Sequence, residues 1–341
     1  MSAAALLVRA LRDPGSLGEG CDWTALISAA RAEQLVGSLA FRLEGLALPP
    51  RVERLFAMHR ADAQRVRVQA LWEAEMCRRA LAPLGVPVVL LKGTAFLAAG
   101  LRAGEGRSIG DLDILVPREA LPEVEQALIN AGWERLKPAE GYDDFYYRQW
   151  MHELPPLIHR ERDRMIDVHH TILPLTARPK PLPGDLIDQS VKLDDGLAVL
   201  SPEHMVVHAA AHLIADGDMA GGLRNLWDID RLCRQFSAER PDYFLSLAEQ
   251  AAAHGLHGQT MRALRLSHRL FGTPLVAYRQ PSRITYAPEP SDRLFIRRLL
   301  ARDGWGRQTR AATRLAFYLR GHLMRMPPLM LARHLMRKAR G

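Results

Sequence analysis

Cysteine is scarce in this sequence, with three residues in 341, at Cys21, Cys77 and Cys233. Their number is odd and their spacing fits no metal-binding pattern, which excludes a disulfide scaffold and a cysteine-based metal site. Unpaired cysteines are usual in a reducing compartment, so we expect a cytoplasmic protein.

The sequence also lacks a long uncharged apolar run. A membrane-spanning helix needs about 18 such residues, and no stretch approaches that length. Near the start, the apolar residues 3–7 precede Arg9 and Arg12, whereas a secretory signal has its basic residues first. With 48% hydrophobic and 25% charged residues, the composition is that of a folded protein and not of a disordered chain. We therefore expect a soluble protein without a transmembrane segment.

Acidic residues are almost absent from the C-terminal segment. Residues 297–341 contain eleven arginines, Lys338 and one acid, Asp303, which gives a formal charge of +11. The whole chain carries +8, so the remainder is slightly acidic. Such a basic amphipathic tail could pack on the core, contact an anionic membrane surface or an acidic partner, or bind nucleic acid, and no nucleic-acid signature beyond the charge decides among these.

Hydrophobic periodicity predicts an α+β protein with helical regions on both sides of a small mixed sheet. Short β-branched runs and alternating segments indicate strands, and apolar residues at 3.6-residue spacing indicate helices. The expected strands lie at residues 86–91, 111–116, 151–159 and 165–169, the last two as a hairpin. The expected regions are an N-terminal helical region (1–82), an α/β core (83–175), a linker with a strand (176–200), a C-terminal helical lobe (201–275), and an irregular segment followed by the basic tail (276–341).

Three carboxylates are the strongest candidates for chemistry. Asp111 and Asp113 lie two residues apart on a predicted strand, so both side chains point to the same face. Two neighbouring carboxylates repel each other unless a cation lies between them, and a divalent metal is the usual partner. Asp167 alternates in the same way on a later predicted strand. If the two strands are neighbours, three carboxylates could hold two Mg²⁺ ions for an in-line phosphoryl displacement.

A second candidate lies upstream, where Lys92, Gly93 and Thr94 follow a predicted strand and precede a predicted helix. Such a turn supplies backbone N–H groups, a hydroxyl and the positive end of a helix to phosphate oxygens. The G-x-x-x-x-G-K-[ST] pattern of a P-loop does not occur in the chain.

Taken in order, these segments resemble the nucleotidyltransferases of the DNA polymerase β superfamily, and most closely the bacterial branch called uncharacterised nucleotidyltransferases. The resemblance spans roughly residues 20–235. It rests on Trp23, Val89-Leu-Leu-Lys-Gly93, Arg107, Asp111-Leu-Asp-Ile-Leu115, Ile166-Asp-Val-His169, Leu200-Ser-Pro-Glu-His204, His208-x-x-x-His212 and Leu226-Trp-Asp228. Two features depart from the superfamily: Thr94 stands where serine is usual, and seventeen residues separate Gly93 from Asp111.

The resemblance implies a metal-dependent transfer of a nucleoside monophosphate from a nucleoside triphosphate to an unidentified acceptor. Mg²⁺ or Mn²⁺ is the expected cofactor and ATP the expected nucleotide. Asp111 and Asp113 would bind both metals, and Asp167 would complete the site and act as, or position, the base for the incoming hydroxyl. The expected phosphate and nucleotide contacts are Lys92, Gly93, Thr94, Arg107 and His169.

Two other interpretations remain open at this point. His204, His208 and His212 lie on one face of a predicted helix, and paired helical histidines can bind Zn²⁺, as in a metal phosphohydrolase. The chain could also be a non-catalytic relative that binds a nucleotide or a partner protein.

Overall fold

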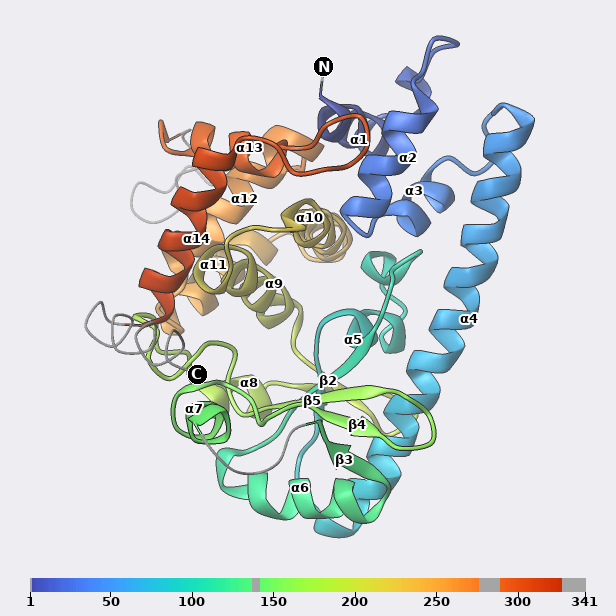
Figure 1. Ribbon diagram of the computed structural model, residues 1–341. Coiled ribbons are helices and arrows are strands. Elements are labelled where there is room, and N and C mark those ends of the chain that lie inside the picture. Colours follow the sequence, from blue (N-terminus) through green and yellow to red (C-terminus); the bar gives the residue numbers. More distant parts are fainter. Residues whose placement is uncertain (1, 137–141, 276–288, 327–341) are drawn as a thin grey trace.

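A computed structural model describes residues 2–136, 142–275 and 289–326 of the chain (Figure 1). A sheet with its flanking helices forms one part of the molecule, and a group of helices forms the other. The long helix α4 (Pro50–Leu81) runs along both parts (Figure 1). The mixed α+β architecture predicted from the sequence is confirmed.

The helices of the described residues follow one another in this order: α1 (Ala3–Arg12), α2 (Trp23–Ala32), α3 (Val36–Arg42), α4, α5 (Lys92–Ala98), α6 (Leu121–Asn130), α7 (Tyr142–Trp150), α8 (Pro183–Asp188), α9 (Pro202–Ala210), α10 (Gly222–Glu239), α11 (Tyr243–Ala253), α12 (His257–Phe271), α13 (Asp292–Leu299) and α14 (Ala311–Arg325). Between α9 and α10, residues 211–216 form a π-helix. None of these helices combines the length and the apolar character that crossing a bilayer requires.

Local signals in the sequence explain where several helices begin and end. Ser201 caps α9 with its side-chain oxygen, which accepts a hydrogen bond from the backbone N–H of His204 at 3.4 Å. Gly272 ends α12 in the left-handed conformation, with φ of 70°. Pro50 begins α4, and no further proline interrupts this helix.

One seven-stranded mixed sheet contains all the strands of the described residues, in the order β3-β4-β5-β2-β1-β7-β6. The strands are β1 (Val89–Leu90), β2 (Asp111–Leu115), β3 (Trp133–Arg135), β4 (Leu157–His159), β5 (Met165–His169), β6 (Val191–Lys192) and β7 (Ala198–Val199). The predicted hairpin is confirmed, because β4 pairs with β5 in antiparallel fashion. The central pair β2–β5 is parallel and brings residues more than fifty positions apart into register.

Two strand predictions were too long. Only residues 89–90 of the expected strand 86–91 pair with β2. Of the expected strand 151–159, residues 157–158 pair with β5, and Glu153 forms an isolated bridge to His169 at the end of β5. Pro155 and Pro156 lack the N–H that a ladder needs, which explains the late start of β4. The segment 176–200, expected to be a linker with one strand, contributes α8 and two strands, and β7 lies beside β1.

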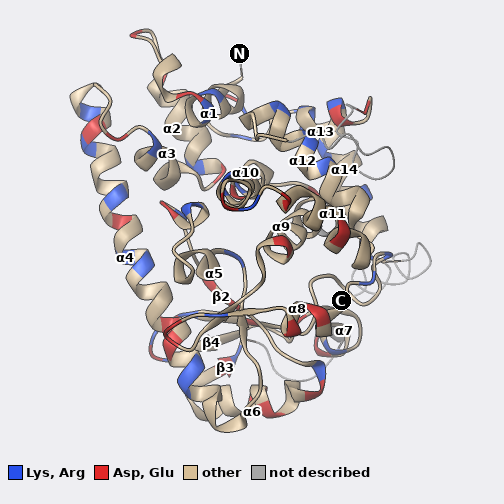
Figure 2. Ribbon diagram, turned by 180° about the vertical axis from the view of Figure 1, so that it is seen from behind, with Lys and Arg blue, Asp and Glu red and all other residues tan. Residues whose placement is uncertain are grey.

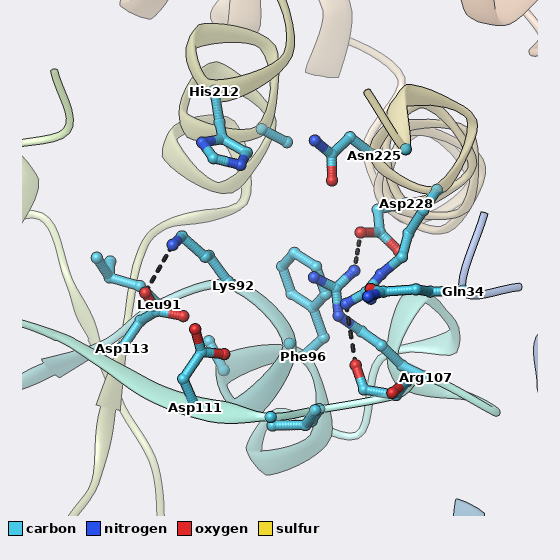
Figure 3. Close-up of a pocket in the computed structure, with 18 of the residues that line it drawn as sticks. Gln34, Leu91, Lys92, Phe96, Arg107, Asp111, Asp113, His212, Asn225 and Asp228 are labelled. Atoms are coloured by element: carbon cyan, nitrogen blue, oxygen red, sulfur yellow. Dashed lines mark hydrogen bonds and ion pairs between the residues drawn. The ribbon is translucent and has the colours of Figure 1, made fainter. Parts of the chain in front are cut away.

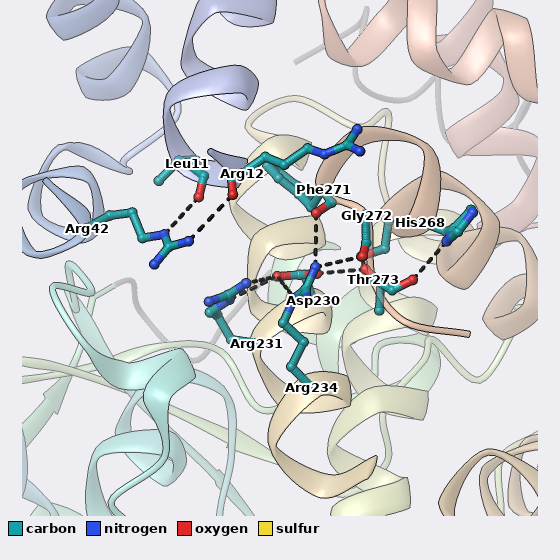
Figure 4. A network of polar contacts seen from close by, with 11 residues as sticks. Leu11, Arg12, Arg42, Asp230, Arg231, Arg234, His268, Phe271, Gly272 and Thr273 are labelled. Carbon is teal, nitrogen blue, oxygen red and sulfur yellow. Dashed lines mark hydrogen bonds and ion pairs between the residues drawn. The ribbon is translucent and has the colours of Figure 1, made fainter. Parts of the chain in front are cut away.

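Polar contacts around Asp230 join several helices of the helical part (Figure 4). The fully buried carboxylate of Asp230 in α10 accepts hydrogen bonds from Arg234 Nε at 2.9 Å and from Thr273 Oγ1 at 2.7 Å. Arg234 also donates to the carbonyl of Gly272 at 2.7 Å, just after α12. Because these donors give the buried carboxylate of Asp230 its hydrogen-bond partners, the network stabilises the contact between α10 and the end of α12.

The described part of the basic tail packs on the helical part. Arg298 Nε donates to the carbonyl of Asp218 at 3.1 Å, and Arg302 Nε contacts Glu33 Oε1 at 2.7 Å. Phe317 in α14 is buried and stacks edge-on against Phe295, with ring centroids 5.0 Å apart. Lys and Arg are dispersed over α4, α13 and other helices (Figure 2). Up to residue 326 the tail therefore contributes to the core, whereas residues 327–341 lie outside the described residues.

Candidate active site

The three predicted carboxylates meet on the central strands. Asp113 in β2 is in direct register with Asp167 in β5, and Asp111 lies two residues before Asp113 on the same face of β2. One carboxylate oxygen from each of the three lies within 4.8 Å of the others. From the sequence we expected this group only if the two strands are neighbours. The parallel pairing of β2 with β5 shows that they are.

The three carboxyl groups differ in their exposure to solvent, and the pKa values of two of them, Asp113 and Asp167, are shifted in opposite directions. Asp111 is exposed, Asp167 is half-buried and Asp113 is buried. Burial, and then the charges of Asp113 and Asp111, raise the pKa of Asp167 to about 7. Burial alone would also raise the pKa of Asp113, but the Lys92 ammonium and the His169 side chain lower it below its usual range. A divalent cation would relieve this repulsion, and carboxylate oxygens are the ligands that Mg²⁺ prefers, so the donor set fits the expected metal.

His169 links Asp113 to a second acid. Its Nε2 lies 3.0 Å from Asp113 Oδ1, and its Nδ1 lies 3.5 Å from Glu153 Oε2. Burial lowers the pKa of His169, although Asp113 opposes this effect. The side chain therefore orients Asp113, and its ring is almost fully buried.

Lys92 contacts the same carboxylate oxygen of Asp113. Its Nζ lies 2.6 Å from Asp113 Oδ1 (Figure 3). Lys92 is the first residue of α5 and has a left-handed backbone, with φ of 50°. Non-glycine residues adopt this conformation at an energetic cost, which is frequent at functional sites.

A cavity of about 730 Å³ lies in front of Asp111 and Asp113, whereas Asp167 is not among the residues that line it. The sheet side contributes Lys92, Gly93, Asp111 and Asp113, while the facing helices contribute His208 and His212 among others (Figure 3). His212 lies in the π-helix, a rare element that is frequent at functional sites. The cavity therefore lies between the sheet part and the helical part.

Thr94 and Arg107 were expected to contact the nucleotide or its phosphates, and their surroundings in the structure differ from that expectation. Thr94 is buried and lines a separate small hollow of about 20 Å³, not the main cavity. Arg107 lines the main cavity but forms a buried ion pair with Asp228 of α10, and its guanidinium lies 5.3 Å from the centre of the Phe96 ring (Figure 3). The structure thus brings Lys92, Gly93 and Arg107 to the cavity, and it places Thr94 beside it.

The three helical histidines do not gather. His204 is buried between Gln250 and His254, with its Nε2 3.1 Å from Gln250 Oε1 and 3.0 Å from His254 Nε2. His208 and His212 line the cavity instead. Within the described part of the chain, the groups that could hold a metal contain none of the three.

Several cavity residues were not expected from the sequence. Gln34 comes from the turn between α2 and α3, and Arg224 and Asn225 come from the first turn of α10. Arg302 reaches the same cavity from the C-terminal segment. No local pattern marks these polar residues, because only tertiary packing brings them together. The neighbouring Leu226-Trp-Asp228 stretch is the one signal that pointed to this part of α10.

A comparison with known protein families matches residues 19–272 to the family described as "Uncharacterised nucleotidyltransferase". The match covers well over half of the chain. The chain belongs to this nucleotidyltransferase family. A comparison with curated proteins yields no match. The matched residues of this nucleotidyltransferase include all three carboxylates and both walls of the cavity, whereas Arg302 lies beyond them.

Proposed function

We propose that this protein transfers a nucleoside monophosphate from a nucleoside triphosphate, with ATP as the first candidate, to a hydroxyl or similar group of an acceptor. The observations that carry the proposal are the register of β2 and β5, in which Asp113 lies opposite Asp167, and the proximity of the three carboxylates, of which Asp111 and Asp113 line the cavity. The family membership supports the same reaction class.

Asp111, Asp113 and Asp167 would hold two Mg²⁺ or Mn²⁺ ions. Bound there, such ions neutralise phosphate charge and stabilise the attacking and leaving oxygens of an in-line displacement. His169 Nε2 lies 3.0 Å from Asp113 Oδ1 and so fixes the orientation of this carboxylate. Asp167 either accepts the proton of the acceptor hydroxyl or positions the group that does.

The phosphates would bind along the start of α5. Lys92 supplies a positive charge, and the backbone of Gly93 lines the same cavity, while the absence of a side chain at Gly93 leaves room for Arg107 and Ile109. Thr94 lies outside the cavity, so its contribution is to the packing of this turn. Arg107 adds positive charge to the wall behind Gly93 while it remains paired with Asp228.

The reaction balances without any further reactant. The acceptor oxygen forms a bond to the α-phosphorus, the bond from this phosphorus to the bridging oxygen of the β-phosphate breaks, and pyrophosphate leaves. The proton of the acceptor passes to Asp167 or to a group that Asp167 positions.

A transfer assay with purified protein tests the proposal. The protein is incubated with each of the four triphosphates, Mg²⁺ or Mn²⁺ and candidate acceptors, and the products are followed by mass spectrometry. Asp113→Asn should lower the rate at least about a hundredfold, because a neutral amide cannot balance a divalent ion. Asp163→Asn is the matched control, since Asp163 lies on the turn between β4 and β5, away from the cavity lining. Full activity of folded Asp113→Asn would contradict the three-carboxylate site.

The same variants separate the two other interpretations. A non-catalytic relative would bind metal and nucleotide without any product, in the wild type as well as in the variants. A histidine-based phosphohydrolase would lose activity when His208 or His212 is replaced and would tolerate Asp113→Asn. The separation of His204 from the cavity disfavours this second possibility.

A further inference from the structure

Arg224 contributes a positive charge to the cavity that Asp111 and Asp113 also line. It lies in the first turn of α10, and its side chain lines the cavity. Family membership and local sequence pattern assign no role to this residue. Its surroundings differ from those of the other arginines at the cavity.

The contacts of Arg224 are with neutral groups. Its guanidinium donates to the side-chain oxygen of Gln34 and, at 3.0 Å, to the backbone carbonyl of Ser108. Its Nε is buried and has no hydrogen-bond partner. By contrast, Arg107 pairs with Asp228, and Arg302 pairs with Glu33. Within residues 2–136, 142–275 and 289–326, Arg224 forms no ion pair of its own.

Arg224 is half-buried. To the extent that its charge is removed from water, the charge is destabilising, because nothing of opposite sign compensates it at contact distance. Burial lowers the pKa of Arg224 to about 10, although the more distant charges of Asp111 and Asp113 oppose this effect. The cost falls when an anionic ligand enters the cavity. A charged side chain that lines a cavity and has no partner of opposite charge is a candidate contact for a ligand.

The segment before α3 holds the guanidinium in place. Gln34, which accepts from Arg224, has a left-handed backbone with φ of 55°. The preceding residue, Glu33, accepts hydrogen bonds from the backbone N–H of Leu223 at 3.2 Å and from Arg302 Nε at 2.7 Å. The carboxylate of Glu33, the residue before Gln34, thus holds Leu223, the residue before Arg224. Because the neighbours of both contacting residues are fixed, the guanidinium is oriented before a ligand arrives.

We propose that Arg224 binds the triphosphate of the nucleotide and retains the pyrophosphate as it leaves. Asp113 is paired with Lys92 on the sheet side, and Arg224 lines the same cavity from the helical side. A triphosphate bound at the carboxylates therefore lies between two cations. The guanidinium can donate two parallel hydrogen bonds to phosphate oxygens, which an ammonium cannot do. The inference rests on the proposed function, since it concerns the ligand of the same cavity.

Calorimetry with inorganic pyrophosphate and with ATP, both in the presence of Mg²⁺, tests the assignment on the full chain. Arg224→Met should weaken the binding of both ligands about tenfold or more, and Arg224→Lys should recover only part of the loss. Arg102→Met is the matched control, because Arg102 is exposed and outside the cavity. The melting temperature of ligand-free Arg224→Met should equal or exceed that of the wild type, since the substitution removes an unpaired charge.

Two results would overturn the role of Arg224, and a third would reassign it. The first is unchanged pyrophosphate and ATP affinity with an unchanged melting temperature in Arg224→Met. The second is unchanged affinity with a lower melting temperature, which would show a purely structural residue. The third is normal ATP binding with a raised KM for the acceptor, which would assign the guanidinium to the acceptor instead. Each of these leaves the proposed function intact provided that Asp113→Asn is inactive; activity in Asp113→Asn would contradict the proposed function itself.

Discussion

Asp113 lies directly opposite Asp167 in the parallel pair β2–β5, and the two carboxyl groups have opposite charge preferences. Asp113 is held in its charged form by Lys92 and His169 despite its burial. Burial and its two acidic neighbours raise the pKa of Asp167 to about 7. In the metal-free site the charges of Asp113 and Asp111 therefore repel a charged Asp167 carboxylate, and a bound cation would relieve this repulsion.

Asp167→Asn should stabilise the metal-free protein and abolish its response to metal. The amide removes a carboxylate that burial and two like charges disfavour, so the melting temperature should rise by about 1–2 °C, as about 1 kcal/mol predicts for a chain of 341 residues. Thermal unfolding with and without Mn²⁺ or Mg²⁺ measures both effects.

Asp163→Asn is the control and should respond to metal like the wild type. A metal-dependent stabilisation that survives in Asp167→Asn would show that Asp167 is not a ligand, because ligands that bind only the folded state stabilise by mass action.

The sequence was sufficient to place the carboxylates because strand alternation is a local rule. Asp111 and Asp113 share a face whatever the rest of the fold does. Their proximity to Asp167 depends on the β2–β5 pairing, which the sequence could only raise as a condition. The cavity residues Gln34 and Arg224 are 190 positions apart, and no periodicity relates such residues before the chain folds.

The position of Thr94 shows the limit of reasoning from a turn motif. The sequence suggested that residues 92–94 form a loop before a helix, whereas Lys92 is already the first residue of α5. Successive side chains on a helix diverge by about 100°, so Lys92 and Phe96 face the cavity together while Thr94 points elsewhere. The start of the helix was three residues earlier than expected, and this rotated the hydroxyl out of the site.

Gly93→Ala should weaken nucleotide binding and also destabilise the protein. A Cβ at this position would overlap the side chain of Arg107 and lie 3.1 Å from Ile109 Cγ1. Overpacking of this kind costs about 1–3 kcal/mol, and it would displace Arg107 from the cavity wall. Chemical denaturation and ATP titration in the presence of Mg²⁺ measure the two effects.

Gly258→Ala is the matched control, because a Cβ there meets no atom within 4 Å and Gly258 lies in the helix α12. This control should be neutral or slightly stabilising, since alanine is the better helix former. From the sequence alone we would expect Gly93 substitutions to leave stability unchanged. If Gly93→Ala is as stable as Gly258→Ala, the close contact with Arg107 is absent in solution.

Arg302→Met should destabilise the protein and weaken nucleotide binding, although Arg302 lies beyond the residues that match the family. The substitution leaves Glu33 buried without its charged partner, and breaking a buried ion pair in this way costs about 3–5 kcal/mol. Glu33 also positions Leu223, next to Arg224, so the cavity wall should loosen. Denaturation and ATP titration are the measurements.

Arg307→Met, with an exposed side chain in the same segment, should behave like the wild type. The double variant Glu33→Met/Arg302→Met should recover part of the stability, because it leaves no unpaired charge. A chain that ends at residue 292 and remains soluble and fully active would contradict a role of this ion pair in the site.

His254 should make the stability of the protein depend on pH below neutrality. Its side chain is fully buried, and its Nδ1 accepts a hydrogen bond from the backbone N–H of Leu182 at 3.1 Å. If Nδ1 were protonated, it would become a donor and would face the backbone N–H of Leu182, which is also a donor. Burial, and then the nearby His204, lower the pKa of His254 from its usual 6.5 to about 4. The unfolded chain therefore takes up a proton in this range before the folded protein does.

The contribution of His254 is complete above pH 6.5 and is lost as the pH falls from 6.5 toward 4. Each proton that the unfolded state takes up in excess lowers the free energy of unfolding by about 1.4 kcal/mol per pH unit. In His254→Asn, the amide oxygen can accept from the N–H of Leu182 but does not titrate, so urea denaturation between pH 7.5 and 4.5 should show a shallower slope. An unchanged slope would mean that other groups, such as His170, whose pKa burial also lowers to about 4, produce the dependence.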